Sequence, residues 1–403
     1  MQIQTEAMNA SLQFCPNLTC CASGLTHQGN IHIHDRKRER YRCTVCRRTF
    51  TSRTGTMLEG LRKPNELIVL VVGLLSYGCP VQAIVHMFGL DERTVALWRD
   101  RAGQQCQRVH DAVVQQGHLT LTHVQADEIR VKGKKGIFWM GLAMEVSSRL
   151  WLAGVVQPSR DHVLADRLLQ GVCRCASGAS HLLICVDGWA AYPNAILRAF
   201  VEQVNESIQT GMQQMQVWSH LVIGQVIKTQ KKHRLVSVKH LLLRGEEQAL
   251  QQALEQSRGG TQINTAYIER LNGTMRERLA SLTRKGRHAS ARLEAFQWGM
   301  YLIGCTYNLC WPHQQLSKKE HLGSICTPAM ASGLTTHIWS VREVLTYKVP
   351  PHILLKAQEA ERQCLAIEPD PLPKPKRMGA ASKYYLLLLK MKEEKAREQS
   401  HAG

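Results

Sequence analysis

Apolar and polar positions follow a strand-like pattern through the middle of the chain. Three runs rich in β-branched and aromatic side chains, residues 119–131, 137–146 and 150–156, are separated by the turn sequences Gly-Lys-Lys-Gly and Ser-Ser. Runs of this kind with short turns between them are typical of consecutive β-hairpins. The pattern therefore predicts three antiparallel strands.

Beyond these runs the pattern alternates between helix and strand. The apolar positions of residues 161–170 and 192–204 have helical spacing, and residues 181–186 form a continuous apolar run. An apolar run of this length is consistent with a buried strand. The order of elements predicts an α/β fold.

A shorter helical pattern precedes the predicted strands. Residues 80–88 have apolar positions on one face, Gly89 can supply a tight turn, and Asp91 is a suitable N-cap for a second helix through Arg101. This spacing is typical of a helix-turn-helix, whose second helix enters the major groove of DNA. An ordinary helical hairpin inside a larger core is the alternative. In the DNA-binding interpretation Val95 and Trp98 pack inward, and the side chains turned toward DNA are Glu92, Arg93, Arg99 or Arg101.

The charge balance favours a nucleic-acid partner. Lys and Arg number 51 against 32 for Asp and Glu, a formal net charge of +19. Each phosphate that a cation contacts releases condensed counterions, so this excess favours binding to a polyanion. The longest apolar runs, residues 67–75 and 384–389, are far shorter than the roughly 20 residues of a membrane-spanning helix. Residues 1–9 lack the pattern of a secretory signal, so we expect a cytoplasmic, nucleoid-associated protein whose 14 cysteines are metal ligands or buried thiols.

Four cysteines near the N-terminus have the spacing of a metal site. Cys15 and Cys20 form a Cys-x4-Cys pair, and Cys43 and Cys46 form a Cys-x2-Cys pair. Four thiolates can complete the closed tetrahedral shell of a structural zinc ion. Unligated thiols are the alternative to zinc, and the residues that could replace a ligand of the looser first pair are Cys21, His32 and His34.

The same segment is strongly basic. Between Arg36 and Arg53 lie eight basic residues and one acidic residue, interleaved with Tyr41 and Phe50. This pattern suits phosphate contacts from a small metal-held fold, although a merely solvated basic face has the same composition. The expected DNA contacts are Arg36, Lys37, Arg38, Arg40, Arg42, Arg47 and Arg48.

Three acidic residues indicate metal-dependent chemistry on phosphodiesters. Asp127 lies on the first predicted strand, Asp187 directly follows the apolar run, and Glu269 lies in a predicted helix. Cleavage by two metals requires carboxylates that converge on ions about 4 Å apart. Oxygen ligands and a phosphate substrate favour Mg²⁺, with Mn²⁺ as a substitute. Rivals for the third ligand, none followed by the Arg-x-Asn pattern of Glu269, are Glu246, Glu247 and Glu255.

Three motifs surround these carboxylates. They are Asp127-Glu128 with Lys132, Lys134, Lys135 and Trp139, then Asp187-Gly188-Trp189 with Tyr192, then Glu269-Arg270-Leu271-Asn272 with Arg276. With these motifs the chain resembles the insertion sequence one family of DDE transposases, from Cys15 to about Leu316. The resemblance implies an RNase H-like core of five mixed strands with flanking helices, and it implies that Asp127, Asp187 and Glu269 form a metal-binding triad.

Further residues around the predicted triad are expected to contact DNA or to pack in the core. Asn272 and Arg276 share the helical face of Glu269, where they could contact the scissile DNA end. Trp139 and Trp151 are expected in the core or in strand pairs. A basic stripe, which could also be a solvated helix face, continues through Arg276, Arg278, Arg284, Lys285, Arg287 and Arg292.

The expected organisation has four parts. These are a zinc-binding head at residues 1–56, a helix-turn-helix domain at 57–117, a catalytic domain at 118–316 with an insertion at about 202–260, and an extension at 317–403 that ends in a mobile basic tail. We expect a bacterial transposase that binds terminal inverted repeats in double-stranded DNA, cleaves a strand and transfers it to target DNA. Pairing two DNA ends implies a homodimer or a higher oligomer. The alternatives are a zinc-containing helix-turn-helix regulator without catalysis and an RNase H-like nuclease without strand transfer.

Overall fold

The structure of the chain is a computed structural model, and it describes residues 8–133, 136–178, 181–204, 214–231, 234–279, 292–319 and 325–367. The described residues belong to one compact unit. Several positions named above lie outside the described residues: the basic tail, Lys134, Lys135, Arg284, Lys285 and Arg287.

A small antiparallel sheet forms the cysteine-rich head. Tyr41 and Phe50 stack with their ring centroids 5.7 Å apart, and both are buried together with Ile31. Few other large apolar side chains contribute, so this core is too small to be stable by burial alone. The strands, in the order in which they pair, are β1 (Ile31–Asp35), β2 (Arg40–Cys43) and β3 (Thr49–Thr51).

Three helices follow the head, and the turn between the second and third is formed as the sequence predicts. Gly89 ends α2 with a φ of 59°, a left-handed conformation that glycine adopts at little cost. Asp91 then caps α3 by accepting hydrogen bonds from the N–H groups of Arg93 and Thr94. The expected inward residues Val95 and Trp98 are buried. The helices are α1 (Asn65–Ser76), α2 (Val81–Phe88) and α3 (Glu92–Val113).

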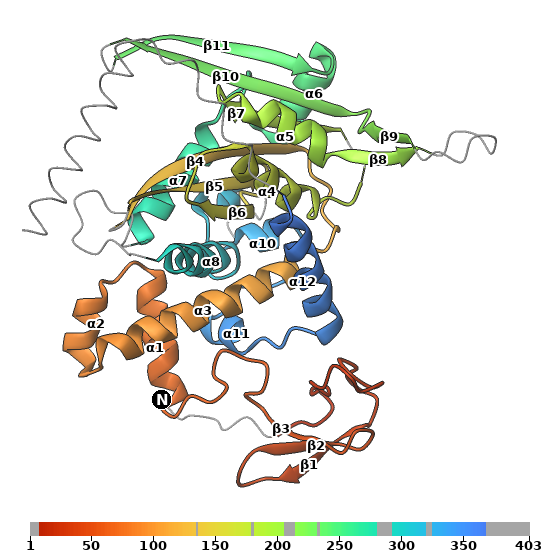
Figure 1. The fold of residues 1–403 in the computed structure, drawn as a ribbon, viewed down its shortest axis with the longest axis vertical. Helices are drawn as coiled ribbons and strands as arrows, with labels where there is room; N and C mark the ends of the chain where they lie inside the picture. Colours follow the sequence, from red (N-terminus) through yellow and green to blue (C-terminus); the bar gives the residue numbers. More distant parts are fainter. Residues whose placement is uncertain are drawn as a thin grey trace, which may run out of the picture. The chain divides into compact units, whose positions relative to one another are not determined.

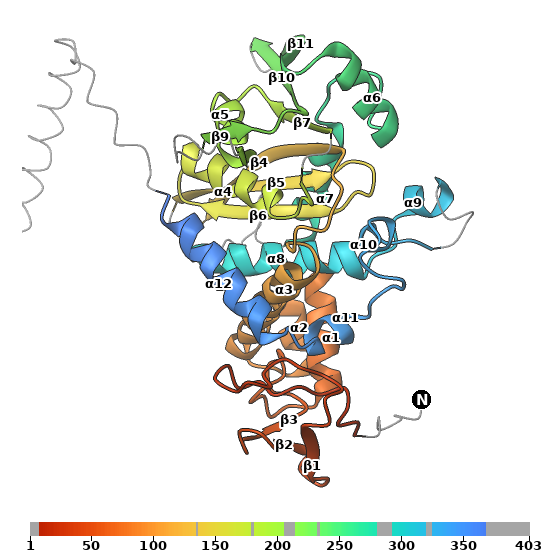
Figure 2. The same ribbon diagram turned by 90° about the vertical axis from the view of Figure 1, so that its right-hand side faces the viewer.

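The third helix is longer than expected, because it ends at Val113 and not at Arg101. Beyond Arg101 it packs against α8 (Leu293–Leu309), which lies between α3 and the main sheet in Figures 1 and 2. Ala102, Cys106 and Val109 are fully buried in this contact. A Cβ atom at Gly103 would collide with Trp298 of α8, so glycine permits the close approach. The buried second half of α3 therefore extends the helix into the core.

The main sheet has six strands in the order β11-β10-β7-β4-β5-β6 (Figure 1). The three antiparallel strands predicted from the hairpin pattern are confirmed as β4, β5 and β6. The strand predicted at residues 181–186 is confirmed as β7, which lies parallel to both β4 and β10. The bounds are β4 (His123–Gly133), β5 (Gly136–Glu145), β6 (Trp151–Gln157), β7 (Leu182–Asp187), β10 (Leu221–Lys231) and β11 (Arg234–Arg244).

Two expectations about the second half of the sheet are wrong. The sheet has a sixth strand, β11, because the span expected as an insertion at 202–260 contains two strands of the main sheet. The helix expected at 192–204 is α5 (Ala191–Ala199), which ends before the strand β8 (Val201–Val204). Strand β8 pairs with β9 (Gln214–Val217), and this pairing outweighs the helical spacing of the local sequence.

Helices cover both faces of the sheet. On β6, Ala153 lies against Gly171 of α4, whereas the adjacent Gly154 lies against Met300 of α8. Successive side chains of a strand point to opposite faces, so α4 and α8 pack on opposite sides. No helix among the described residues is long and apolar enough to cross a membrane. The remaining helices are α4 (His162–Cys173), α6 (Glu247–Ser257), α7 (Ala266–Arg278), α9 (Gln314–Lys319), α10 (Pro328–Ala331), α11 (Val341–Thr346) and α12 (Pro351–Leu365).

Candidate active site

The parallel pairing of β4 and β7 brings two of the predicted carboxylates together. Ala126 of β4 is in register with Val186 of β7. The next residues along the two strands are Asp127 and Asp187, so they leave the paired region side by side. Asp127 and Asp187 are far apart in the sequence, and the parallel pairing of β4 and β7 brings them together at the point where this pairing ends.

A third carboxylate, Glu128, joins this pair. One oxygen each from Asp127, Glu128 and Asp187 lie within 4.8 Å of one another. Carboxylate oxygens at this spacing could bind a divalent cation. Glu128 was part of the sequence motif but was not predicted as a ligand.

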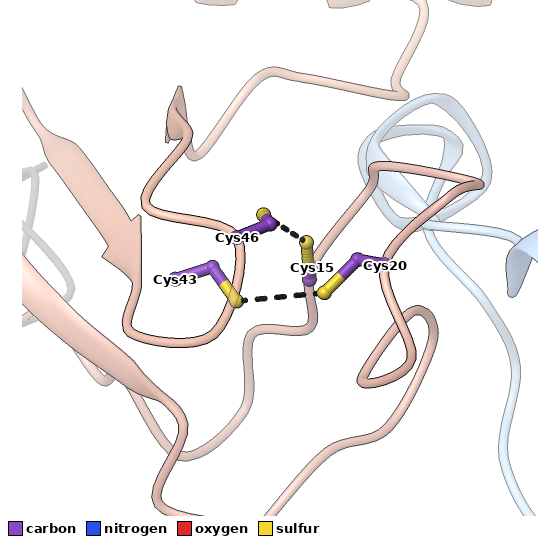
Figure 3. Close-up of side chains that lie close together, drawn as sticks. All are labelled: Cys15, Cys20, Cys43 and Cys46. Carbon is purple, nitrogen blue, oxygen red and sulfur yellow. Dashed lines mark hydrogen bonds between the residues drawn. The ribbon is translucent and has the colours of Figure 1, made fainter.

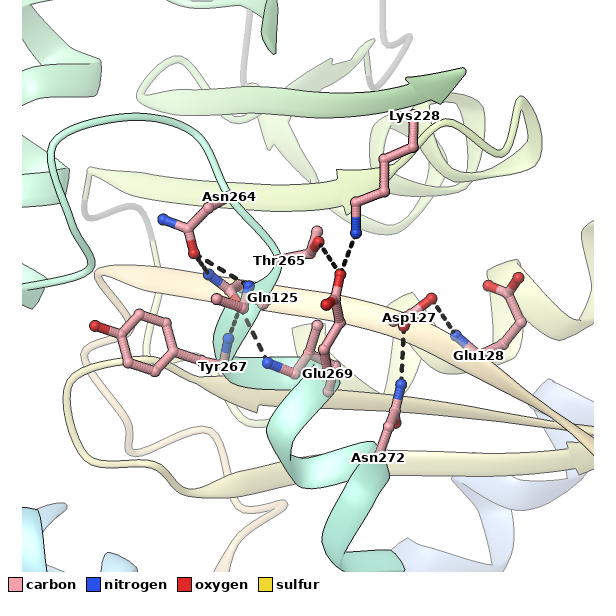
Figure 4. Close-up of polar contacts among 11 residues, drawn as sticks. Gln125, Asp127, Glu128, Lys228, Asn264, Thr265, Tyr267, Glu269 and Asn272 are labelled. Atoms are coloured by element: carbon pink, nitrogen blue, oxygen red, sulfur yellow. Dashed lines mark hydrogen bonds and ion pairs between the residues drawn. The ribbon is translucent and has the colours of Figure 1, made fainter. Parts of the chain in front are cut away.

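Glu269 lies outside this group of three. Its carboxylate forms an ion pair with Lys228 of β10 and accepts a hydrogen bond of 2.8 Å from the Thr265 hydroxyl (Figure 4). The side chain is 47% exposed, so it remains open to solvent. The rival acidic residues Glu246, Glu247 and Glu255 are exposed at α6 or its N-terminus and do not belong to the group either.

A buried glutamine of β4 positions the helix that carries Glu269. The Gln125 side-chain oxygen accepts hydrogen bonds from the N–H groups of Tyr267 and Ile268, at 3.0 and 3.1 Å (Figure 4). These are donors of the first turn of α7, whose N-cap residue Thr265 makes no side-chain capping bond. Gln125 therefore caps the helix from the strand, two residues before Asp127.

Asn272, one turn beyond Glu269 on α7, orients Asp127. Its amide donates a hydrogen bond of 2.8 Å to Asp127 Oδ2, while Asp127 Oδ1 accepts from the N–H of Glu128. Asn272 is buried, whereas Arg276 on the same helical face is partly exposed. The structure thus places Asn272 against a carboxylate, although the sequence suggested a DNA contact.

Burial and mutual repulsion make this group of carboxylates reluctant to ionise fully. Burial, followed by the charges of Glu128 and Asp187, raises the pKa of Asp127 to about 7. Burial and Asp187 also raise the pKa of Glu128. For Glu269, burial acts to raise the pKa, but the hydrogen bonds from Lys228 and Thr265 outweigh it and lower the pKa. A cation among the three clustered carboxylates would relieve their repulsion.

Arg160, in the connection between β6 and α4, contacts two of the three clustered carboxylates. Its guanidinium forms an ion pair with Glu128, and its Nη2 lies 3.5 Å from Asp187 Oδ2. The guanidinium carbon lies 4.5 Å from the Trp189 ring centroid and 5.3 Å from that of Trp139. Sequence reasoning missed Arg160, since it follows no motif.

Two aromatic residues of the motif also belong to this site. The Tyr192 hydroxyl of α5 donates a hydrogen bond of 2.9 Å to Glu128 Oε2. Burial and the Glu128 charge raise the pKa of Tyr192, so the phenol remains a donor. Trp139, expected in the core or in a strand pair, is paired with Arg130 of β4 and Gln157 of β6, is partly buried and lies near Arg160. Trp151 is fully buried, also as expected.

The four cysteines of the head converge as their spacing predicts. Cys15 Sγ lies 3.5 Å from Cys46 Sγ, and Cys20 Sγ lies 3.9 Å from Cys43 Sγ (Figure 3). Four sulfurs around a zinc ion are about 3.8 Å apart, given Zn–S bonds of about 2.3 Å. All four sulfurs lie within 4.8 Å of one another, and the group could bind zinc. The alternative ligands Cys21, His32 and His34 are not part of the group.

The expected DNA-contacting residues of the head are mostly on its surface. Arg40 is partly buried and bonded to Thr49, and Arg48 donates a hydrogen bond of 3.2 Å to Asn17. Arg38 lies near Asp35. The exposed members of the set are Arg36, Lys37, Arg38, Arg42, Arg47 and Arg48.

The two arginines expected to contact DNA from α3 differ in environment. Arg93, at the start of the helix, is exposed. Arg99 is partly buried and donates two hydrogen bonds to the neighbouring Asp100, at 2.8 and 3.1 Å. Arg93 is therefore the more available of the two for a phosphate or a base.

Comparison with known proteins adds no relative to this picture. No protein-family model matches the chain, and no curated protein matches it at a significant level.

Proposed function

We propose that the chain is a DDE-type transposase of the insertion sequence one family, which cleaves the ends of a mobile DNA element and joins them to new DNA. The observation that carries the proposal is the convergence of Asp127, Glu128 and Asp187 where the parallel pairing of β4 and β7 ends, with Glu269 on the adjacent helix. Three or more carboxylates from separate elements suit the binding of metal ions that act on phosphodiesters. The net charge of +19 supports a DNA substrate.

The order of strands supports an RNase H-like core. Strands β6, β5 and β4 are antiparallel neighbours, β7 and β10 continue the sheet in parallel, and β11 adds an antiparallel edge. The carboxylates lie on the two central parallel strands, β4 and β7, where open α/β sheets bind their ligands outside the strand ends. Five of the six strands thus correspond to the core that the sequence resemblance implies.

In this proposal Asp127 and Asp187 hold the catalytic metal, together with Glu269 or Glu128. Mg²⁺ bound there would activate a water or a 3′-hydroxyl and stabilise the leaving oxygen. Asn272 fixes the orientation of the Asp127 carboxylate through its amide. Tyr192 fixes one oxygen of Glu128 in the same way.

We assign site recognition to the head and to a helix-turn-helix formed by α2 and α3. The Gly89 turn and the Asp91 cap support this unit, and the exposed Arg93 lies in the first turn of α3. The N-terminal residues of a recognition helix contact base edges in such units. The cysteine group would hold the head's basic strands in shape around zinc. A dimer or larger assembly would pair the two ends of the element.

The proposal is tested by a cleavage and strand-transfer assay with Mg²⁺ on duplexes from the ends of the element. Asp187→Asn and Glu269→Gln should each abolish both reactions while DNA binding persists. Glu255→Gln, at an exposed position of α6, is the matched control and should react like the parent. Cleavage without joining would favour a nuclease. DNA binding without cleavage would favour a regulator, and full activity of the Asp187 variant would refute this assignment.

A further inference from the structure

Two cations of the chain occupy the carboxylates that a metal ion would need. Arg160 pairs with Glu128 and reaches Asp187, and Lys228 pairs with Glu269. Arg160 comes from the connection between β6 and α4, and Lys228 comes from β10. Each of the two cations therefore forms an ion pair with a carboxylate of the site.

The ion pairs of Arg160 use only one nitrogen of its guanidinium, Nη2. Glu128 is 4% exposed and also bonded by Tyr192, so it is a fixed anchor for the guanidinium. The rings of Trp139 and Trp189 restrict the guanidinium further. A guanidinium has five N–H donors, and the contacts to Glu128 and Asp187 both use Nη2. With its side chain 33% exposed, Arg160 can direct its remaining donors to a ligand beside the metal site.

Lys228 is placed beyond the end of the parallel strands. The last residues of β10 and β7 in register are Val226 and Asp187, so Lys228 lies two positions further along. Its side chain is 40% exposed, and its ammonium can rotate three donors toward solvent or a phosphate. Glu269 is the residue that it now neutralises.

We infer that Arg160 and Lys228 are ligands for the backbone phosphates of the DNA, and that in DNA-free protein they compete with the metal ion for Asp187 and Glu269. This inference rests on the proposed function. A divalent cation that binds the carboxylates repels both side chains, and a DNA phosphate is the ligand that receives them. DNA and metal therefore bind cooperatively. DNA draws Arg160 and Lys228 away from the carboxylates that the metal ion needs, and the metal ion frees both side chains for the phosphates.

The test measures Mn²⁺ binding by electron paramagnetic resonance on the full chain, with and without a pre-cleaved end duplex. The duplex carries a 3′-dideoxy terminus, so no strand transfer occurs. For the parent protein we expect the duplex to tighten Mn²⁺ binding by about five- to 150-fold, the usual range of coupling between sites. Arg160→Gln and Lys228→Gln should bind Mn²⁺ more tightly than the parent without DNA. In both variants most of the coupling should disappear.

DNA affinity supplies the second readout. In the presence of Mn²⁺, each variant should bind the duplex more weakly, with the slope of log affinity against log salt reduced by about one for each phosphate that it no longer binds. Arg160→Lys keeps the charge and should restore the parent's Mn²⁺ affinity, but not its full DNA affinity, because lysine lacks the planar group that lies over Trp189. Lys356→Gln, at an exposed position of α12, is the control and should leave both affinities unchanged.

The outcomes separate this inference from the proposed function. Unchanged Mn²⁺ affinity and unchanged coupling in both glutamine variants would refute the inference, even if the protein cleaves DNA. Cooperative binding that depends on Arg160 and Lys228, without cleavage by the parent, would support the inference and count against the transposase. If Arg160→Gln does not fold, the more exposed Lys228→Gln decides the question by itself.

Discussion

The side chain of Gln125 is one of two amides that connect the strand of Asp127 to the helix of Glu269, the other being Asn272. Gln125 is buried in β4 and accepts two backbone N–H groups from the first turn of α7, while its own amide donates to Asn264. Helix termini leave such donors without partners, and a cap satisfies them. The Gln125 acceptor therefore helps to fix the position of Glu269 relative to Asp127, together with the Asn272 hydrogen bond.

We expect Gln125→Met to lower the free energy of unfolding by about 1–3 kcal/mol, because two buried N–H groups lose their acceptor. Urea denaturation followed by circular dichroism measures the change. Gln251→Met, at an exposed position of α6, removes an amide of the same size from the surface and should cost far less. Equal stability of the two variants would show that the cap is dispensable.

Sequence reasoning identified Asp127 and Asp187 but not the two cations, Arg160 and Lys228, that lie against the carboxylates of the site. Asp127 lies on the first predicted strand and Asp187 follows an apolar run, and these local signals can be read from a single sequence. Arg160 lies in a connection without a pattern, and its contact with Glu128 exists only because α4 folds back onto the sheet. Lys228 belongs to a basic run whose contact with Glu269 is made by pairing of β10 with β7. Contacts of this kind depend on tertiary structure, which the spacing of apolar and polar residues along the chain does not indicate.

At the scale of elements, the local hairpins were predictable and the long-range pairings were not. The strands β4, β5 and β6 follow one another with short turns, so alternation and turn residues define them. The strand β10 lies in the span that was expected as an insertion. Its place in the sheet comes from its parallel pairing with β7, a long-range contact that the local sequence does not indicate. The helix α3 exceeded its expected end because α8 covers its second half. In each case packing extended or replaced what the local pattern indicated.

If the proposed function holds, we expect the β10–β11 hairpin to follow the DNA backbone away from the carboxylates. Residues 221–244 contain no acidic residue, and Lys231, Arg234 and Lys239 are exposed. Reversing these three charges should weaken DNA binding and reduce the salt slope by about 0.9 for each phosphate that is no longer bound. Fluorescence anisotropy at several salt concentrations measures the slope. Lys356→Glu on α12 is the control, and an unchanged slope in the triple variant would remove the hairpin from the DNA path.

The head should depend on its metal for folding. Its buried core is small and includes Cys15, Cys20 and Cys43, so the loss of a ligand removes both packing and coordination. We expect the purified protein to carry one zinc ion per chain. Cys43→Ser should release it and make the head sensitive to proteolysis. Elemental analysis and limited trypsin digestion measure the two effects. Cys21→Ser is the matched control, since Cys21 is exposed and outside the group, and zinc loss in that variant would contradict the assignment.

At the scale of the whole molecule, α3 links the helical part of the chain to the sheet through a buried histidine. The Nε2–H of His110 donates a hydrogen bond of 3.0 Å to the Leu152 carbonyl of β6, and its ring lies 4.4 Å from that of Trp151. Within the part of the chain that the structure describes, His110 Nδ1 has no hydrogen-bond partner. Burial, against a smaller opposing effect of the Leu152 carbonyl, lowers the pKa of His110 to about 3. The histidine therefore remains neutral in the folded protein at any ordinary pH.

This histidine should make the fold sensitive to acid. Below a pH of about 6.5 the unfolded chain binds a proton at His110 that the folded protein does not accept. The contribution of His110 to the free energy of unfolding is therefore fully present above that pH, and it is lost as the pH falls toward 3. The cost is about 1.4 kcal/mol per pH unit. Asp111, whose pKa burial raises to about 7, has the opposite effect, but it is present in every variant compared. In urea titrations between pH 6 and pH 4, His110→Gln should therefore show a shallower pH dependence than the parent by about that amount. His86→Gln, at an exposed position of α2, should keep the parent slope, and a His110 variant that also keeps it would show that this histidine accepts its proton in the folded state.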